Sequence, residues 1–262
     1  MKPRPLPRRR SPYDRRVHRP TLRSALSAFV SACLLSGMPA AWAQGPAWSG
    51  SAWLESDRFY RGVSQTEGHA SAGLGLNLDH ASGAYGGLAV AAVELVPGPR
   101  RAQTLLYGGF ARRFGESPLG WDLGLQDVRF QDHAGRNYLE AYAGLGGTDW
   151  SVRLHWSPDY YGMGRAAQYL AWQQGGALPF PRWRWSLRAG VLHWPRELPG
   201  QRRWRADGQA GIAFDLGRFT LEAAATAAQR SQSLYPSAYE SRYGSSSDTA
   251  RVHGLLRLSA GF

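Results

Sequence analysis

Cysteine is almost absent from this chain of 262 residues, which contains one. That residue, Cys33, lies in an apolar run near the N-terminus, so the rest of the chain has no thiol for a disulfide, a redox centre or a zinc site. The segment Val30–Cys33 also has the form of a lipoprotein cleavage box. Because Leu34 and Leu35 continue the apolar run where a lipoprotein usually becomes polar, we interpret Cys33 as part of an export leader.

Long apolar runs are also absent after residue 43. No stretch of about 18 consecutive apolar residues occurs there, so the sequence predicts no transmembrane helix. There is no G-x-S-x-G elbow, no H-E-x-x-H motif and no phosphate-binding loop. The histidines of this region have no paired metal-ligand spacing, and we expect His155 and His253, on predicted polar faces, to form hydrogen bonds rather than act as catalytic bases. The sequence therefore predicts a protein that is not an enzyme and holds no metal or cofactor.

The N-terminus has the three parts of a secretory signal peptide. Residues 1–23 are strongly basic, and the apolar run Ala25–Met38 is too short to span a bilayer. Ala41, Trp42 and Ala43 then form a small-x-small cleavage site. We predict a signal peptide at residues 1–43, cleaved near Ala43. Its basic part is long, so either the true start codon lies further along or the extension is real.

Acidic residues are outnumbered in the full chain, 19 against 31 Lys and Arg, for a net charge of +12. The leader holds nine of the basic residues and one acid, which leaves 22 against 18, or +4, for the rest of the chain. The high isoelectric point therefore belongs mainly to the leader. We predict no nucleic-acid partner.

The last segment, Thr249–Phe262, alternates in polarity. Counting back from Phe262, every second residue is small or apolar, whereas Arg251, His253 and Arg257 lie between them. A period of two predicts a strand with one apolar and one polar face. In a soluble sandwich such a strand would be an exposed edge. In an outer-membrane barrel it closes the sheet, and Phe262 is predicted to be read by the insertion machinery during assembly.

The chain after the leader reads as one domain of repeated hairpins. Trp150–Ser157 and Trp183–Trp194 alternate clearly and carry aromatic residues at the ends of their apolar faces, as expected at membrane interfaces. Short and longer connections alternate along the chain, which is typical of outer-membrane barrels. We predict an all-β fold at residues 44–262, a transmembrane antiparallel up-and-down β-barrel of twelve strands. These strands are predicted at Trp48–Ser56, His69–Asp79, Ala84–Leu95, Gln103–Phe114, Trp121–Phe130, Asn137–Leu145, Trp150–Ser157, Ala167–Gly175, Trp183–Trp194, Trp204–Phe214, Arg218–Arg230 and Thr249–Phe262.

Charged residues on the predicted polar faces must line water or pair across the lumen. Arg184, Arg188 and Arg205 lie on neighbouring predicted strands. They either form a basic ladder that favours anions or pair with Asp207 and Glu222 in a filled interior. Glu55 and Arg251 lie on the same faces. The candidates for the lumen and its selectivity are Arg153, Arg184, Arg188, Arg205, Asp207, Glu222 and Arg257.

The segment Ser56–Thr66 reads S-D-R-F-Y-R-G-V-S-Q-T. It resembles the S-D-Y-x-F-R-G-x-S-Q signature of the TorF-type porins of proteobacterial outer membranes, although Arg58 stands where Tyr is usual and Tyr60 where Phe is. Weaker similarity extends over residues 48–162. The resemblance implies a small outer-membrane porin, without a defined substrate. The matching loop residues singled out here are Asp57, Arg61, Gly62, Ser64 and Gln65.

The chemistry of this loop can be read from its residues. Gly62 permits a turn that other residues make with difficulty. Arg61 is expected to fold into the barrel mouth and to pair with Glu55 or Asp57. Ser64 and Gln65 supply hydrogen bonds for a packed loop. Such a loop either stiffens the mouth without touching a solute or takes part in selecting one.

The sequence thus favours an outer-membrane porin or narrow channel for passive diffusion of small polar or anionic solutes. The alternatives are an outer-membrane lipid-modifying enzyme, for which no Ser–His pair is visible, and a closed structural or loop-presenting barrel. The expected partners are outer-membrane lipids and lipopolysaccharide, the insertion machinery and small solutes. The oligomeric state stays open.

Overall fold

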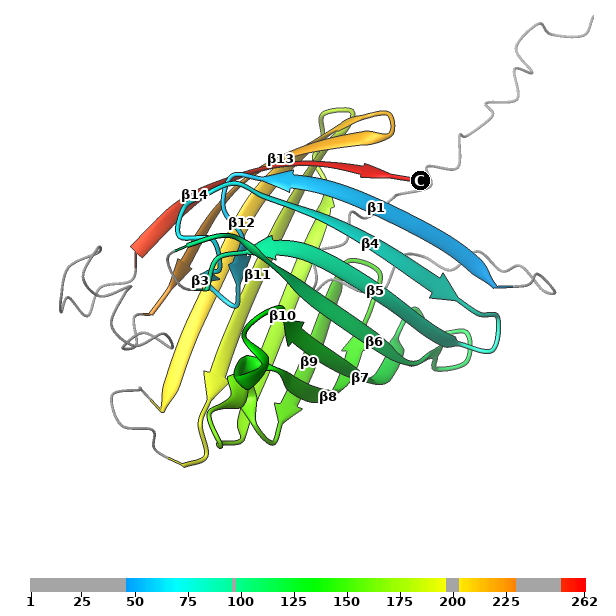
Figure 1. The fold of residues 1–262 in the computed structure, drawn as a ribbon. Helices are drawn as coiled ribbons and strands as arrows, with labels where there is room; N and C mark the ends of the chain where they lie inside the picture. Colours follow the sequence, from blue (N-terminus) through cyan, green and yellow to red (C-terminus); the bar gives the residue numbers. More distant parts are fainter. Residues whose placement is uncertain (1–45, 96–97, 197–202, 230–250) are drawn as a thin grey trace, which may run out of the picture.

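A computed structural model describes residues 46–95, 98–196, 203–229 and 251–262. The predicted signal peptide with its cleavage site at Ala43, and the loop at 231–248, lie outside these residues. The described residues form a closed barrel of twelve antiparallel strands, as predicted (Figure 1). Each of the twelve predicted strand ranges overlaps one strand of the barrel.

The strands follow one another around the ring, so the barrel is of the up-and-down kind. β1 pairs with β4, and each strand from β4 to β14 pairs with the next one along the chain. The last strand, β14, pairs with β1 and closes the ring. The small hairpin β2–β3 forms a separate two-stranded sheet within a segment for which the sequence predicts a loop. The strands of the structure are β1 Ala47–Glu55, β2 Phe59–Tyr60, β3 Val63–Ser64, β4 Ser71–Asp79, β5 Ala84–Val93, β6 Arg101–Arg113, β7 Gly120–Phe130, β8 Tyr138–Gly146, β9 Trp150–Ser157, β10 Ala167–Ala177, β11 Trp183–His193, β12 Trp204–Leu216, β13 Phe219–Ala228 and β14 Arg251–Gly261.

The outer face of the barrel is apolar. In β9, Leu154 and Trp156 are 47% and 46% exposed, whereas His155 between them is buried inside. The same alternation exposes leucines on most other strands, for example Leu74 on β4 and Leu123 on β7. An outer surface of this composition fits hydrocarbon rather than water, because exposed apolar patches of this extent are costly in water.

The two ends of the barrel differ. The end at which β1 begins and β14 ends has only short connections, such as residues 80–83 and 147–149, and we call it the short-turn end. The opposite end carries the longer connections, including residues 56–70 and 158–166, and we call it the long-loop end. The helical segments in the described part of the chain are two single turns, η1 Ala134–Arg136 and η2 Tyr160–Gly162, and neither could cross a membrane.

β1 and β14 close the sheet. Figure 1 shows β14, in red, beside β1, in blue, and their register runs from Ser51 opposite Gly261 to Glu55 opposite Arg257. Phe262 extends this pairing by two backbone hydrogen bonds with Gly50, of 2.7 and 3.0 Å. The Phe262 ring lies where a side chain at residue 50 would stand, so Gly50 leaves the space that the ring occupies.

Removal of Phe262 should impair assembly, because the closing strand loses two hydrogen bonds and the ring that covers Gly50. We expect the deletion, and to a lesser degree Phe262→Ala, to lower the fraction of barrel that migrates as the compact band on unheated gels of membrane fractions. Phe180→Ala, at an exposed turn position, is the matched control. Wild-type amounts of compact barrel after deletion of Phe262 would contradict this role.

Candidate functional site: the lumen and its inward loop

The first loop, residues 56–70, folds into the barrel instead of extending from it. Its hairpin turns at Arg61 and Gly62, whose φ angles of 51° and 73° are both positive. This is the backbone of a tight two-residue hairpin turn, in which Gly is favoured and a residue such as Arg is strained by about 1 kcal/mol. Phe59, Tyr60 and Ser64 are all buried, and Figure 1 shows β3 lying inside the ring of strands.

The base of the loop is held by hydrogen bonds to one carboxylate. The hydroxyls of Ser64 and Thr66 both donate to Asp57 Oδ1, at 2.7 Å each. Thr66 Oγ1 in turn accepts from the backbone N–H of Arg58 at 3.0 Å. Asp57 therefore acts as the centre of the loop, and the sequence-based expectation that it pairs with Arg61 is wrong.

Two further contacts attach the loop to the barrel wall and to the connection between β9 and β10. Arg58 donates to Glu55 Oε1 at 3.0 Å and to the side-chain oxygen of Gln103 on β6, also at 3.0 Å. Gln65 donates to the hydroxyl of Tyr161, in η2, at 2.8 Å. Glu55 was the other expected partner of Arg61, but it forms its ion pair with Arg58 instead.

Arg61 reaches across the lumen to Glu140 on β8. Its two terminal nitrogens donate to the two oxygens of Glu140 at 2.8 and 2.6 Å, and both residues are 1% exposed. β8 lies five strands from β1 around the ring of twelve, so this bidentate ion pair joins the loop to a distant part of the wall. Gln126 donates to the same carboxylate at 2.6 Å, and His155 Nδ1 lies 3.2 Å from it.

Aromatic rings surround the Arg61 guanidinium. Its carbon lies 4.2 Å from the ring centre of Tyr169, 4.9 Å from that of Tyr60 and 5.3 Å from that of Tyr160. Burial alone would lower the pKa of Arg61, but the Glu140 carboxylate more than offsets this and the pKa lies well above its usual value. Arg61 therefore stays charged, and cation–π contacts add to the ion pair.

The tip of the hairpin abuts a third part of the wall. A Cβ atom on Gly62 would lie 2.5 Å from the Cβ of Ala228 on β13 and 2.6 Å from that of Asp207 on β12. Arg205, also on β12, donates to the backbone carbonyl of Arg61 at 3.3 Å. The loop thus spans the lumen from β1 to β8 and to β12–β13, and the space at Gly62 admits no larger residue.

Three of the predicted lumen arginines lie in a row down one wall. Arg205 on β12 stands opposite Leu192 on β11. Counted from Leu192 along β11 toward the short-turn end, Arg188 and then Arg184 follow at intervals of four residues. At about 3.3 Å per residue, successive levels are about 13 Å apart. Arg184 is paired with Asp215 by two hydrogen bonds of 2.8 and 2.9 Å.

The other two arginines of the row have no carboxylate partner. Arg188 contacts the neutral side-chain oxygen of Gln209 at 3.4 Å, and Arg205 contacts only a backbone carbonyl among the residues that the structure describes. Pairing with Asp207 or Glu222, one of the two sequence-based alternatives, is not seen for any of the three arginines, and Arg184 pairs with Asp215 instead. Arg184 forms an ion pair, whereas Arg188 and Arg205 form none with a described carboxylate. On the same inner face, Asp207 on β12 and Glu222 on β13 likewise form no ion pair with a described cation.

The remaining predicted lumen residues lie elsewhere on the inner face. Arg153 forms an ion pair with Asp122 on β7 at 2.6 Å. Asp207 accepts from the Tyr169 hydroxyl at 3.1 Å rather than pairing with an arginine. Arg257 is buried, with its guanidinium carbon 5.2 Å from the ring of Trp53. Glu222 stands opposite Arg257 in the β13–β14 register. Of Arg251, only the backbone is described.

Sequence reasoning missed the acidic partners of these arginines. Glu140, Asp122 and Asp215 each carry one of the ion pairs above, and none was singled out. Glu140 lies within a predicted strand, where an acid on a face shared with Tyr138 and Tyr142 was a usable signal for a lumen residue. No sequence signal pointed from Arg61 to Glu140, which is 79 residues away.

Comparisons with known proteins agree with this architecture. The sequence matches the family described as "Bacterial protein of unknown function (Gcw_chp)" over residues 40–252. No curated protein matches it significantly. A solved structure of the NanC porin covers 82% of this chain and 99% of its own at 8% identity, with a TM-score of 0.52. A structure of the KdgM porin covers 82% of this chain and 98% of its own at 9% identity, with a TM-score of 0.48. A structure of LpxR from Salmonella typhimurium covers 82% of this chain and 99% of its own at 10% identity, with a TM-score of 0.41. At these identities the likeness to NanC shows the fold.

Gly62→Ala should displace the hairpin from β12–β13, because the new methyl group has no room beside Ala228 and Asp207. We expect a larger ionic conductance than that of the wild type in planar bilayers. Gly217→Ala is the matched control, since Gly217 has a φ of 75° and nothing within 4 Å of an added Cβ. Equal conductance of the two variants would show that the contact at Gly62 does not position the loop.

Removal of either partner of the Arg61–Glu140 pair should destabilise the barrel, because the other charge stays buried. A loss of about 3–5 kcal/mol is expected for Arg61→Met or Glu140→Leu, and the double variant should recover much of it. Thermal unfolding in detergent, followed by circular dichroism, measures these changes. Strictly additive effects would indicate that the pair contributes no coupling.

Proposed function

The chain belongs to the bacterial family Gcw_chp, whose function is unknown, and we propose that it is an outer-membrane porin with a narrow lumen. It would pass small polar or anionic solutes by passive diffusion. The proposal includes an N-terminal signal peptide at residues 1–43 that directs export, and the insertion machinery that reads Phe262 as a partner. The first-loop motif supports placement among the TorF-type porins.

The observation that carries this proposal is the pair of arginines on the β11–β12 wall that form no ion pair. Arg188 and Arg205 lie inside the barrel without a carboxylate partner in the described residues. The buried Nε atoms of both residues also lack a hydrogen-bond partner within the described protein. Buried donors of this kind need water or a polar solute, so they favour a hydrated lumen over a dry core.

Selection would follow from size and charge together. The hairpin that crosses from β1 to β8 narrows the lumen, so a solute would have to pass beside it. The wall with Arg188 and Arg205 would attract anions into that passage, because rings and rows of arginine favour anions in pores. The bidentate pair with Glu140 neutralises the charge of Arg61. Arg61 would therefore limit the size of the solutes that pass and would not select them by charge.

A closed barrel is the second candidate, and the span of the first loop favours it. The hairpin contacts three parts of the wall, and its anchor at Glu140 is fully buried. A barrel blocked in this way would present its loops rather than conduct. A lipid-modifying enzyme fits less well, because His155 faces inward against Glu140 and away from the lipid side where such a reaction would occur.

Conductance in planar bilayers tests the proposal. The wild type should give discrete channels with a preference for anions under a salt gradient, and Arg188→Gln should reduce that preference because it removes a positive charge that forms no ion pair. Arg112→Gln, exposed at the outer face of the short-turn end, is the matched control. Absence of conductance above that of the bare membrane would favour the closed barrel. An unchanged ion preference in Arg188→Gln would remove Arg188 from the selection mechanism.

A further inference from the structure

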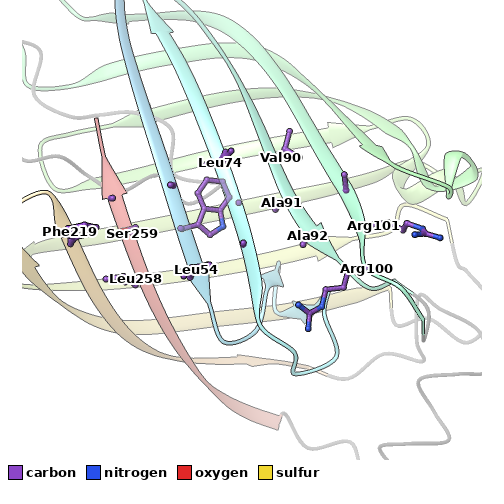
Figure 2. Close-up of a pocket in the computed structure, with 16 residues that line it drawn as sticks. Leu54, Leu74, Val90, Ala91, Ala92, Arg100, Arg101, Phe219, Leu258 and Ser259 are labelled. Atoms are coloured by element: carbon purple, nitrogen blue, oxygen red, sulfur yellow. The ribbon is translucent and has the colours of Figure 1, made fainter.

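An apolar groove crosses the outer face of the barrel (Figure 2). It has a volume of about 640 Å³ and crosses β13, β14, β1, β4, β5 and β6, which are consecutive in the ring. Figure 2 shows its lining from Phe219 at one end to Arg100 and Arg101 at the other. The groove lies on the opposite face of the wall from the lumen.

Alanines form the floor of this groove. Ala52 pairs with Ala260 across the β1–β14 closure, and Ala92 pairs with Ala102 between β5 and β6. Leu54 and Leu74, 59% and 62% exposed, border this floor. At the alanine positions these strands present methyl groups in place of larger side chains, and a hydrocarbon chain lying in the groove would regain the missing dispersion contacts.

The dimensions of the groove fit an acyl chain. The five spacings between six strands, at about 4.8 Å each, give the groove a length of about 24 Å. This length exceeds the thickness of one leaflet, which is half of a hydrocarbon core about 30 Å thick. Because the strands of such barrels are tilted, the groove runs obliquely from the long-loop end of β6 toward the short-turn end of β13. A chain that enters at the long-loop end would follow it into the membrane interior.

Arginine stands at the long-loop end of the groove. Arg101 pairs with Asp132 at 2.7 Å, whereas Arg100 is exposed and has no ion-pair partner in the described part of the chain. A guanidinium at the interface is well suited to a phosphate, which it can bind by charge-assisted hydrogen bonds. A second copy of the barrel is a poorer occupant, because packing its apolar face here would leave Arg100 without a counter-charge.

We propose that the groove binds a phosphorylated lipid of the leaflet at the long-loop end, with one acyl chain on the alanine floor and a phosphate at Arg100. In an outer membrane this lipid is lipopolysaccharide, through its lipid A part. The proposal rests on the outer-membrane location proposed above. It assigns the lipid a defined site rather than general contact with the apolar face.

Native mass spectrometry of the purified barrel in detergent, titrated with bisphosphorylated lipid A, tests the proposal. The wild type should retain one lipid, and Arg100→Gln should weaken its binding by about ten-fold, the effect of losing one charge-assisted contact. Ala92→Leu, which fills the floor, should weaken it similarly. The matched controls are Arg112→Gln and Ala143→Leu, both at exposed positions outside the groove, and they should bind as the wild type does.

Two comparisons separate the lipid from other occupants. Dephosphorylated lipid A should bind to the wild type no better than lipid A binds to Arg100→Gln, and inorganic phosphate alone should not compete. Equal lipid affinity in all four variants would overturn the proposal. A dimer that Ala92→Leu dissociates would overturn it in favour of a second copy. Conductance is measured separately, so a barrel that binds lipid without conducting would refute the porin function and not the lipid site.

Discussion

Closure of the sheet between β1 and β14 is the constraint on which the rest of this structure depends. A strand edge exposed to hydrocarbon would leave its backbone N–H and C=O groups without partners, and each such group is costly there. The register from Ser51–Gly261 to Glu55–Arg257 removes both edges at once. It also brings the end of β1 to the long-loop rim, from which the first loop turns inward. The lumen, the loop and the outer groove all follow from this closed ring.

Within the ring, the first loop is held in place by one ion pair between residues that are far apart in the sequence. Arg61 and Glu140 meet across the lumen with nearly ideal bidentate geometry and almost no exposure. Burial of two charges is costly, so the value of the pair lies in specificity, since few other positions of the loop would satisfy both groups. The strained backbone at Arg61 and the tight contact at Gly62 are compatible with that single position. On a different wall, Arg188 and Arg205 form no ion pair with a described carboxylate.

Much of the barrel could be predicted, and the reason is local. Alternation in segments such as Trp150–Ser157 fixes which side chains point inward, because successive residues of a strand face opposite sides. The inward placement of Arg153, Arg184, Arg188 and Arg205 follows from that rule alone. Their partners do not, because which acid reaches which arginine depends on strand register and tilt. Arg61 was expected to pair with its sequence neighbours Glu55 and Asp57, and the loop geometry gives those acids to Arg58 and to the hydroxyls of Ser64 and Thr66.

The sequence by itself determined the fold class, the number of strands and the polarity of each face, because these depend on a period of two residues and on turn spacing. Only the tertiary structure decided that the first loop lies inside the barrel, that Arg61 pairs with Glu140 and that Arg188 and Arg205 form no ion pair among the described residues. It also placed alanines from non-adjacent segments side by side to form the outer groove beneath Leu54 and Leu74. These features arise from contacts between residues far apart in the chain, which local pattern does not encode.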